Sequence, residues 1–288
     1  MTELSKAKLT ADDRRRDNIG RLYIYPVISR RAGGLSIGIN LNPNQACNWR
    51  CIYCQVPNLT RGGAPEINLT QLENELKSIL QDILHGDFYA RYSFPSELRY
   101  ISDLAIAGDG EPTTCRVFTA VIEIIRRVGE QFNLIGQLPL TLITNGSLIM
   151  RPEIQRGISQ WAQLGGRVWF KIDRATTAGI FQINQIKLSP QKVIRNLAIS
   201  ANLCPTWIQT CLFAFDGNPP EESEQQAYLA LLSEIRRQGI SIAGILLYGL
   251  ARKTHQPEAA RLSKLPRAWI EQFAQRIQEI GYNVAINE

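Results

Sequence analysis

The chain has 288 residues, of which 44% are hydrophobic and 20% are charged, and its net charge at pH 7 is +6. These proportions are typical of a soluble globular protein with a sizeable core, and the positive charge favours anionic partners only weakly. The longest apolar run, residues 240–251, is too short to span a bilayer, and the first ten residues lack the apolar stretch of a secretory signal. We therefore expect no membrane segment and a cytoplasmic protein whose six cysteines are free of disulfides.

The N-terminal residues 1–20 are polar and predict a flexible lead-in to a single domain that spans residues 21–288. The segment 21–34 alternates apolar and polar residues, which is typical of a strand, before it breaks at two glycines. Residues 35–41 form an apolar run of the length of one buried strand, and the Asn-Pro-Asn sequence that follows predicts a turn. The next residues are therefore expected on a loop that leaves the end of a strand.

Three cysteines, Cys47, Cys51 and Cys54, lie in this loop with the spacing C-x3-C-x2-C. Three thiolates this close in sequence can bind one metal centre without help from the rest of the fold. With six cysteines in the chain, chance would produce this spacing in roughly a few cases in a thousand. The triplet therefore predicts a metal site.

The triplet, with Tyr53 directly before its third cysteine, resembles the cluster loop of the radical S-adenosylmethionine (SAM) enzymes. The resemblance implies that the thiolates bind three irons of a 4Fe-4S cluster and leave the fourth iron open for the amino and carboxylate groups of SAM. It also implies that the reduced cluster cleaves SAM to a 5'-deoxyadenosyl radical, which abstracts hydrogen from a substrate. An external electron donor of the flavodoxin or ferredoxin type is the partner that this chemistry implies.

A helix is expected after the cysteines, because Thr70 and Glu73 have the spacing of a capping box and apolar residues follow at helical spacing. Residues 104–107 are expected to form the next strand, and Thr113 or Thr114 to cap the helix after it. The first of these helices is expected to bury a face made of Leu72, Leu76, Ile79, Leu80, Ile83 and Leu84.

A glycine-rich acidic segment, Gly108-Asp109-Gly110-Glu111-Pro112, directly follows the strand at residues 104–107. Glycines let the backbone approach a ligand closely, and a carboxylate suits an ammonium group. The segment resembles the G-G-E-P motif of radical SAM enzymes, with Asp109 where many relatives have glycine or asparagine. The resemblance implies that Gly108, Gly110, Glu111 and Pro112 contact the amino end of SAM.

Alternation of strands and helices continues to the end of the chain. Ser189 and Pro190 have the pattern of a helix start, a cap followed by proline at the first helical position. Six strand-then-helix units predict an α/β fold, and the resemblance makes it a partial, TIM-like (β/α)6 barrel with N- and C-terminal additions. The later strands are expected at residues 140–144, 168–172, 207–215 and 240–248, and the later helices at residues 152–164, from 190, 220–238 and 266–280.

Polar residues at the strand ends are candidate site residues, because loops at the carboxyl ends of the strands carry the active groups of such barrels. Asn145 and Asp173 follow two of the expected strands, and the resemblance implies that both lie near SAM or substrate. Asn145 precedes a glycine and therefore also fits a simple turn. Lys171 lies two residues before Asp173, so that the two side chains point to the same face of a strand.

Three arginines, before and after these elements, give an indication of the substrate class. Arg30 and Arg31 match an arginine pair in a radical SAM subgroup that includes the wyosine-forming tRNA enzymes, and Arg252 resembles an arginine of the same subgroup that contacts SAM or substrate. This resemblance implies a tRNA base as substrate. Archaeal relatives carry an N-terminal cysteine set, however, and no cysteine precedes Cys47 here. A protein substrate, such as the partner of a glycyl-radical activase, therefore stays open.

A structural zinc site is the alternative of another class. Such a site is usually closed by four ligands, and no fourth cysteine or histidine lies near the triplet in sequence. Cys115, Cys204 and Cys211 are scattered and are expected to be buried small hydrophobic residues, with Cys115 close to Glu111. Iron and sulfide content, measured against zinc content, separates the two interpretations.

Overall fold

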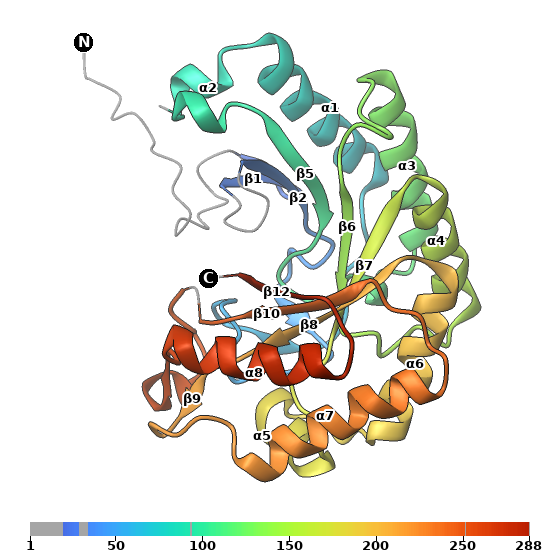
Figure 1. Cartoon of the computed structure of the whole chain (residues 1–288). Coiled ribbons are helices and arrows are strands. Elements are labelled where there is room, and N and C mark those ends of the chain that lie inside the picture. Colours follow the sequence, from blue (N-terminus) through green and yellow to red (C-terminus); the bar gives the residue numbers. More distant parts are fainter. Residues whose placement is uncertain (1–19, 29–33, 93, 251, 288) are drawn as a thin grey trace.

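The computed structural model describes residues 20–28, 34–92, 94–250 and 252–287. An eight-stranded sheet in the order β1-β2-β5-β6-β7-β8-β10-β12 forms its centre. Figure 1 shows this sheet strongly curved, with the long helices along its outer side. The strands of the sheet are β1 (Ile24–Ile28), β2 (Leu35–Ile39), β5 (Ile101–Ile106), β6 (Leu140–Thr144), β7 (Gly166–Lys171), β8 (Thr206–Cys211), β10 (Gly244–Tyr248) and β12 (Val284–Asn287).

Six neighbouring strands, from β2 to β10, run parallel to one another. Strand β12 adds a further parallel strand beyond β10, and β1 is antiparallel to β2 at the other edge. Within the described ranges β1 and β12 do not pair with each other, so the sheet is a partial barrel. The predicted α/β fold with six parallel strands is confirmed, and β1 and β12 are its N- and C-terminal additions.

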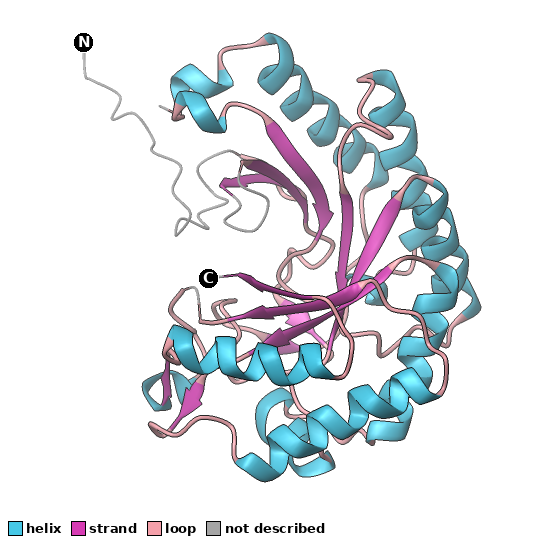
Figure 2. Cartoon of the chain, viewed as in Figure 1, coloured by secondary structure: helices cyan, strands magenta, loops and turns pink. Residues whose placement is uncertain are grey.

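Helices cover the outer side of the sheet, as the cyan ribbons around the magenta strands show (Figure 2). Two small sheets lie apart from the main one: β3 (Ala46–Cys47) pairs with β4 (Thr60–Arg61), and β9 (Ala214–Phe215) pairs with β11 (Leu262–Ser263). The α-helices are α1 (Leu69–His85), α2 (Phe88–Arg91), α3 (Phe118–Gln131), α4 (Pro152–Gln163), α5 (Thr177–Asn184), α6 (Pro190–Leu203), α7 (Glu222–Arg237) and α8 (Arg267–Glu279), with 3-10 turns η2 (Ser96–Leu98), η3 (Pro112–Thr114) and η4 (Pro257–Arg261).

Apolar side chains between sheet and helices form the core. Every residue of β2 and β5 is buried, which is typical of parallel strands covered on both faces. Helix α1 buries the predicted face except for Leu84, which is 40% exposed because it lies at the edge of the apolar stripe. Among the helices that the structure describes, none combines the length and the apolar composition needed to cross a membrane.

The start of α1 differs from the prediction. Asn68 caps the helix, and its side chain accepts a hydrogen bond of 3.0 Å from the amide of Gln71. The predicted capping box of Thr70 and Glu73 is therefore wrong, because Asn68 takes the cap position two residues earlier. Glu73 instead forms an ion pair of 2.8 Å with Lys77.

The start of α3 differs as well. Residues Pro112–Thr114 form the turn η3, which Glu111 caps, and α3 begins only at Phe118. The prediction that Thr113 or Thr114 caps this helix is therefore wrong. The start of α6 is confirmed, since the Ser189 side chain accepts a hydrogen bond from the Lys192 amide.

Two of the later strands are shorter than expected. The expected strand 207–215 ends at Cys211, and Ala214–Phe215 pairs with another segment as β9. The expected strand 240–248 begins only at Gly244, because residues 240–243 carry the chain from α7 back to the sheet. Helix α5 was not expected, because its sequence is apolar on most faces and shows no helical stripe.

The predicted lead-in, residues 1–20, lies outside the described residues except for Gly20. Arg30 and Arg31 also lie outside them. The single domain over residues 21–288 stays a prediction.

Candidate active site

The cysteine loop, residues 42–56, leaves β2 and is fastened to α5 by its backbone. The amide of Arg50 donates to the carbonyl of Asn184 at 3.3 Å, and the amide of Ile52 donates to the carbonyl of Ile183 at 2.9 Å. A short stretch of parallel pairing between β3 and β4 closes the loop on itself. The end of α5, far away in sequence, therefore fixes the middle of the triplet.

A second segment, just before η4, also fastens the cysteine loop. The Thr254 hydroxyl and the His255 amide both donate to the carbonyl of Cys54, at 2.8 and 3.1 Å. Arg50 forms two hydrogen bonds with Glu258, of 2.9 and 2.7 Å, in the fork geometry that suits a carboxylate. Both backbone and side chains therefore hold the loop at its C-terminal end.

The three thiols of the triplet differ in exposure but influence one another. Cys51 is buried, whereas Cys47 and Cys54 are partly exposed. The pKa of Cys47 is raised to about 12, chiefly by burial, with smaller contributions from Glu111, Cys51 and Cys54, so the sulfurs lie within electrostatic reach of one another. Burial likewise raises the pKa of Cys51 to about 12. Without a metal these groups are neutral thiols at pH 7, and binding a metal as thiolates would release their protons.

Two hydrogen bonds reach the sulfurs. The amide of Trp49 donates to Cys47 Sγ at 3.4 Å, and the side-chain amide of Asn184 donates to Cys51 Sγ at 3.3 Å. Such donors stabilise a negatively charged sulfur, whether as a thiolate or as a metal ligand. The loop therefore provides polar support for ligands in otherwise apolar surroundings.

The donor set, three thiols on one loop, is of the kind that holds a four-iron cluster, in which each thiolate binds a different iron. Within the described residues, no group of three Cys, His, Asp or Glu side chains is placed to hold a single metal ion. The indole N–H of Trp49, in the middle of the triplet, is buried and has no acceptor among the described residues. A bound sulfide or thiolate would supply that acceptor.

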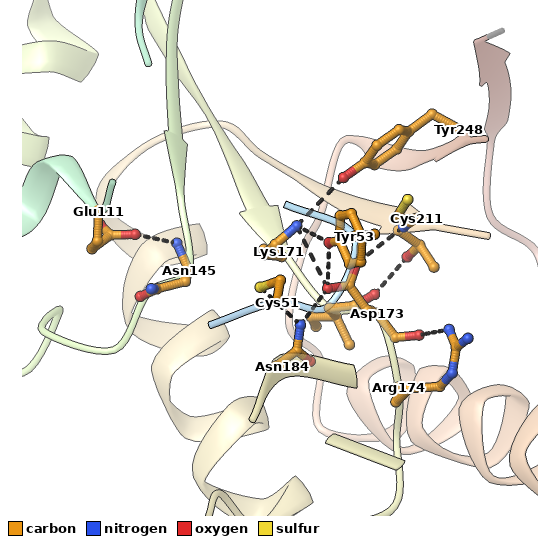
Figure 3. A network of polar contacts seen from close by, with 12 residues as sticks. Cys51, Tyr53, Glu111, Asn145, Lys171, Asp173, Arg174, Asn184, Cys211 and Tyr248 are labelled. Carbon is orange, nitrogen blue, oxygen red and sulfur yellow. Dashed lines mark hydrogen bonds and ion pairs between the residues drawn. The ribbon is translucent and has the colours of Figure 1, made fainter. Parts of the chain in front are cut away.

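Glu111 joins the ends of β5 and β6. Its carboxylate accepts hydrogen bonds from the hydroxyls of Thr113 and Thr144, at 2.6 and 2.5 Å, and from the amide of Asn145 at 2.7 Å. Burial raises the pKa of Glu111, while these hydrogen bonds lower it in part. The predicted ligand for the amino group of SAM thus already accepts several hydrogen bonds from the protein, of which Figure 3 shows the one from Asn145.

Asn145 connects this strand end to the cysteine loop. Its side-chain amide donates to Asn48 Oδ1 at 2.9 Å, and Asn48 donates in turn to the hydroxyl of Ser147 at 2.7 Å. Gly146 has a φ of +66°, which favours glycine, so the predicted turn is also present. Asn145 therefore forms the turn and contacts the loop of the triplet at once.

The glycines of the glycine-rich acidic segment serve close packing. A Cβ on Gly110 would lie 2.1 Å from the carbonyl oxygen of Ala46, and a Cβ on Gly108 would lie 2.0 Å from Asn40 Oδ1. Asp109 accepts a hydrogen bond of 3.1 Å from the same Asn40 side chain. The segment is therefore pressed against the chain that leads into the cysteine loop, and the buried Pro112 follows as the first residue of η3.

Asp173, after β7, is the centre of a second polar cluster. It is 3% exposed and accepts hydrogen bonds from Tyr53 Oη and Asn184 Nδ2, both at 2.7 Å, and from the amide of Cys211 at 3.0 Å. Its carboxylate also lies 3.5 Å from the ammonium group of Lys171. The prediction that Lys171 and Asp173 share one face is confirmed (Figure 3).

Lys171 carries the positive charge of this cluster. Its ammonium group donates to Tyr53 Oη and, at 3.4 Å, to Tyr248 Oη. Burial, the largest single effect, lowers the pKa of Lys171, but Asp173, Tyr248, Cys51 and Cys211 together outweigh burial, and the pKa lies well above its usual value. Burial and the charge of Asp173 raise the pKa of Tyr53, so its phenol stays protonated and donates. The cluster thus holds one positive charge beside one negative charge.

Sequence reasoning missed Asn184, Cys211 and Tyr248 as site residues, although Cys211 is buried in an apolar cluster, as predicted. Asn184 lies on α5, which gave no amphipathic signal, whereas the other two lie at strand ends and could have been found there. The small apolar cluster around Cys51 also includes Cys211, whose pKa burial raises. Cys115 and Cys204 lie in the main core, as predicted. Arg252 follows β10 by four residues and is half-buried.

Two solved structures share this arrangement of strands and helices. A radical SAM methyltransferase from Sphaerobacter thermophilus superposes with a TM-score of 0.58 and 13% identity, over 88% of this chain and 66% of the other. The structure of TYW1 with a lysine-pyruvate adduct bound gives a TM-score of 0.54 and 16% identity, over 85% and 73%. The chain therefore has the fold of the radical SAM enzymes, the class that the cysteine loop also indicates.

Curated relatives match only part of the chain, and no family model matches it. A protein named GTPase Obg from Brachyspira hyodysenteriae is 30% identical over 139 residues, 45% of this chain and 16% of that protein. A UPF0026 protein from Methanocaldococcus jannaschii is 29% identical over 150 residues, 51% of this chain and 39% of that protein. A UPF0026 protein from Helicobacter pylori is 26% identical over 137 residues, 47% and 38%. The chain thus spans less than half the length of these relatives.

Proposed function

We propose that this protein is a radical SAM enzyme that binds a 4Fe-4S cluster through Cys47, Cys51 and Cys54. The observation that carries the proposal is the position of the triplet, on the loop that leaves the first parallel strand of a partial barrel with the radical SAM fold. Active groups of parallel barrels come from such loops at the carboxyl ends of strands. The cluster would supply one electron to SAM and so generate a 5'-deoxyadenosyl radical.

The residues around the triplet would position the cosubstrate. Gly108, Gly110 and Pro112 shape the turn at the end of β5, and Glu111 fixes that turn against β6 through its three hydrogen-bonding neighbours. Because Glu111 Oε1 already accepts from Thr113 and Thr144 while, among the described residues, Oε2 accepts from Asn145 alone, we assign the contact with the SAM amino group to Oε2 and the backbone of the turn. The remaining proposed contacts come from residues at other strand ends or in the cysteine loop: Tyr53, Asn145, Asp173 and Arg252.

The same proposal includes a class of substrate and a type of reductant. A tRNA base or a protein would donate the hydrogen atom, and the resemblance of Arg252 to an arginine of the wyosine-forming tRNA enzymes favours the first of these. The reductant would be an external one-electron carrier of the flavodoxin or ferredoxin type, in the cytoplasm. The net charge of +6 favours encounter with an acidic carrier, and added salt would slow a reduction that depends on this attraction.

The test is anaerobic reconstitution with iron and sulfide, followed by reduction with dithionite in the presence of SAM. We expect absorbance near 400 nm, on the order typical of such clusters, and release of 5'-deoxyadenosine. Cys51→Ala is expected to abolish both, whereas Cys204→Ala, which changes a buried cysteine of the main core, retains both. Release of 5'-deoxyadenosine by Cys51→Ala at the wild-type rate, or bound zinc in place of iron, would overturn the proposal.

A further inference from the structure

Asn184 lies between the cysteine triplet and the Lys171–Asp173 pair. Its side-chain nitrogen lies 3.3 Å from Cys51 Sγ and 2.7 Å from Asp173 Oδ2, and the residue is 1% exposed. The side chains of Cys51 and Asp173 converge on this one nitrogen in Figure 3. A single amide group thus bridges a proposed cluster ligand and the charged cluster beside it.

The orientation of this amide is fixed by chemistry. Asp173 Oδ2 accepts a hydrogen bond from Tyr53 Oη and lies 3.5 Å from the ammonium of Lys171, so this oxygen acts as an acceptor. The NH2 end of Asn184 must therefore face Asp173, which leaves its second N–H for Cys51 Sγ.

The backbone around Asn184 is fixed as well. Thr176 caps α5 at its start and also donates to Glu224 of α7. At the other end, Arg61 donates to the carbonyls of Asn48 and Gln185, and so ties the end of α5 to the cysteine loop. The donor is therefore held in place independently of any cofactor.

We propose that Asn184 is a positioning residue that sets the reduction potential of the cluster by donating a hydrogen bond to the Cys51 sulfur. This inference rests on the proposed function. A reduced cluster carries more negative charge on its sulfurs, so an N–H donor stabilises the reduced form and raises the potential. Removal of the donor lowers the potential and makes the cluster harder to reduce.

The experiment compares the reconstituted full chain with Asn184→Leu, which keeps the approximate shape and removes the N–H. We expect the equilibrium between reduced and oxidised cluster to move about tenfold toward oxidised, which is about 59 mV for a one-electron couple. Redox titration followed by electron paramagnetic resonance (EPR) gives the potential. Resonance Raman spectroscopy gives the Fe–S(Cys) stretching frequency, which rises when a sulfur loses its donor. Gln182→Leu, on an exposed position of the same helix, is the matched control and keeps both values.

The outcomes separate this inference from the proposed function. A wild-type chain that assembles no iron-sulfur cluster overturns both. A wild-type cluster whose potential and Fe–S frequency are unchanged in Asn184→Leu overturns the role of Asn184 alone. Where Asn184→Leu fails to fold or to load iron, Asn184→Ala, which also removes the N–H donor, replaces it. Its potential and Fe–S frequency are expected to shift in the same directions, and wild-type values of both there would overturn the role.

Discussion

The cysteine loop is held from two sides by contacts of different chemical kinds. On the side of β5 and β6, Asn145 contacts the loop through a hydrogen bond between two neutral amide side chains, to Asn48, and Glu111 holds Thr144 and Asn145 in place behind it. On the side of β7, α5 and η4, the contacts involve charged groups: Tyr53 donates to Asp173 of the Lys171–Asp173 ion pair, and Arg50 forms an ion pair with Glu258.

The difference shows how one barrel can give two buried carboxylates different partners. Glu111 has only neutral donors, and its buried charge is disfavoured, which is why its pKa is raised. Asp173 has an ammonium group beside it, and that pair keeps a separated charge next to the proposed cluster site. The contacts on the neutral side, those of Glu111 and Asn145, therefore shape a turn. On the charged side, the Lys171–Asp173 pair places charges beside the proposed cluster site.

The largest effect is expected on the charged side, for Asp173→Asn. This change leaves the buried Lys171 ammonium without its counter-charge, and we expect the free energy of unfolding to fall by about 3–5 kcal/mol. Urea denaturation followed by circular dichroism measures the loss. The double variant Lys171→Met/Asp173→Asn should recover part of the stability, because no charge is then left buried. If the double variant loses as much free energy of unfolding as Asp173→Asn and Lys171→Met lose together, the two side chains are not coupled.

A smaller effect is expected on the neutral side, for Glu111→Gln. The new amide NH2 faces N–H and O–H donors, so some of the hydrogen bonds are lost, at a cost of about 1–3 kcal/mol in the free energy of unfolding.

The pH dependence of this variant has a defined sign. The folded state raises the pKa of Glu111, so its contribution to stability is fully present below the ordinary value of 4.5 and is lost as pH rises through the raised pKa. Glutamine does not titrate. The stability of the wild type relative to Glu111→Gln should therefore decrease as pH rises above 4.5, and denaturation at several pH values measures it. A difference that grows with pH would contradict the raised pKa.

The smallest effect is expected for Arg50→Gln, which removes the pair with Glu258. The side chains are 28% and 18% exposed, so solvent screens part of the attraction, and we expect a loss of about 0.2–1 kcal/mol. Arg267→Gln, in a pair whose side chains are 62% and 50% exposed, is the control and should change stability less. Equal losses in the two variants would mean that the Arg50 contact adds nothing specific to the loop.

Hydrophobic periodicity was sufficient to predict the parallel strands and most helices, because each element needs an apolar face whatever its neighbours are. Lys171 and Asp173 were paired correctly, since strand geometry alone puts residues two apart on one face. Asn184 could not be found in this way, because its importance arises from contacts with Cys51 and Asp173 that only the tertiary fold creates. Asn68 was overlooked as a cap because Thr70 and Glu73 gave a competing local signal.

The central claim, a cluster with one iron open to SAM, is tested most directly by EPR spectroscopy of the reduced, reconstituted protein with and without SAM. The account predicts that SAM changes the spectrum of the cluster, because it binds the iron that the three cysteines leave open. A reduced cluster whose spectrum is identical in the presence of saturating SAM would contradict it.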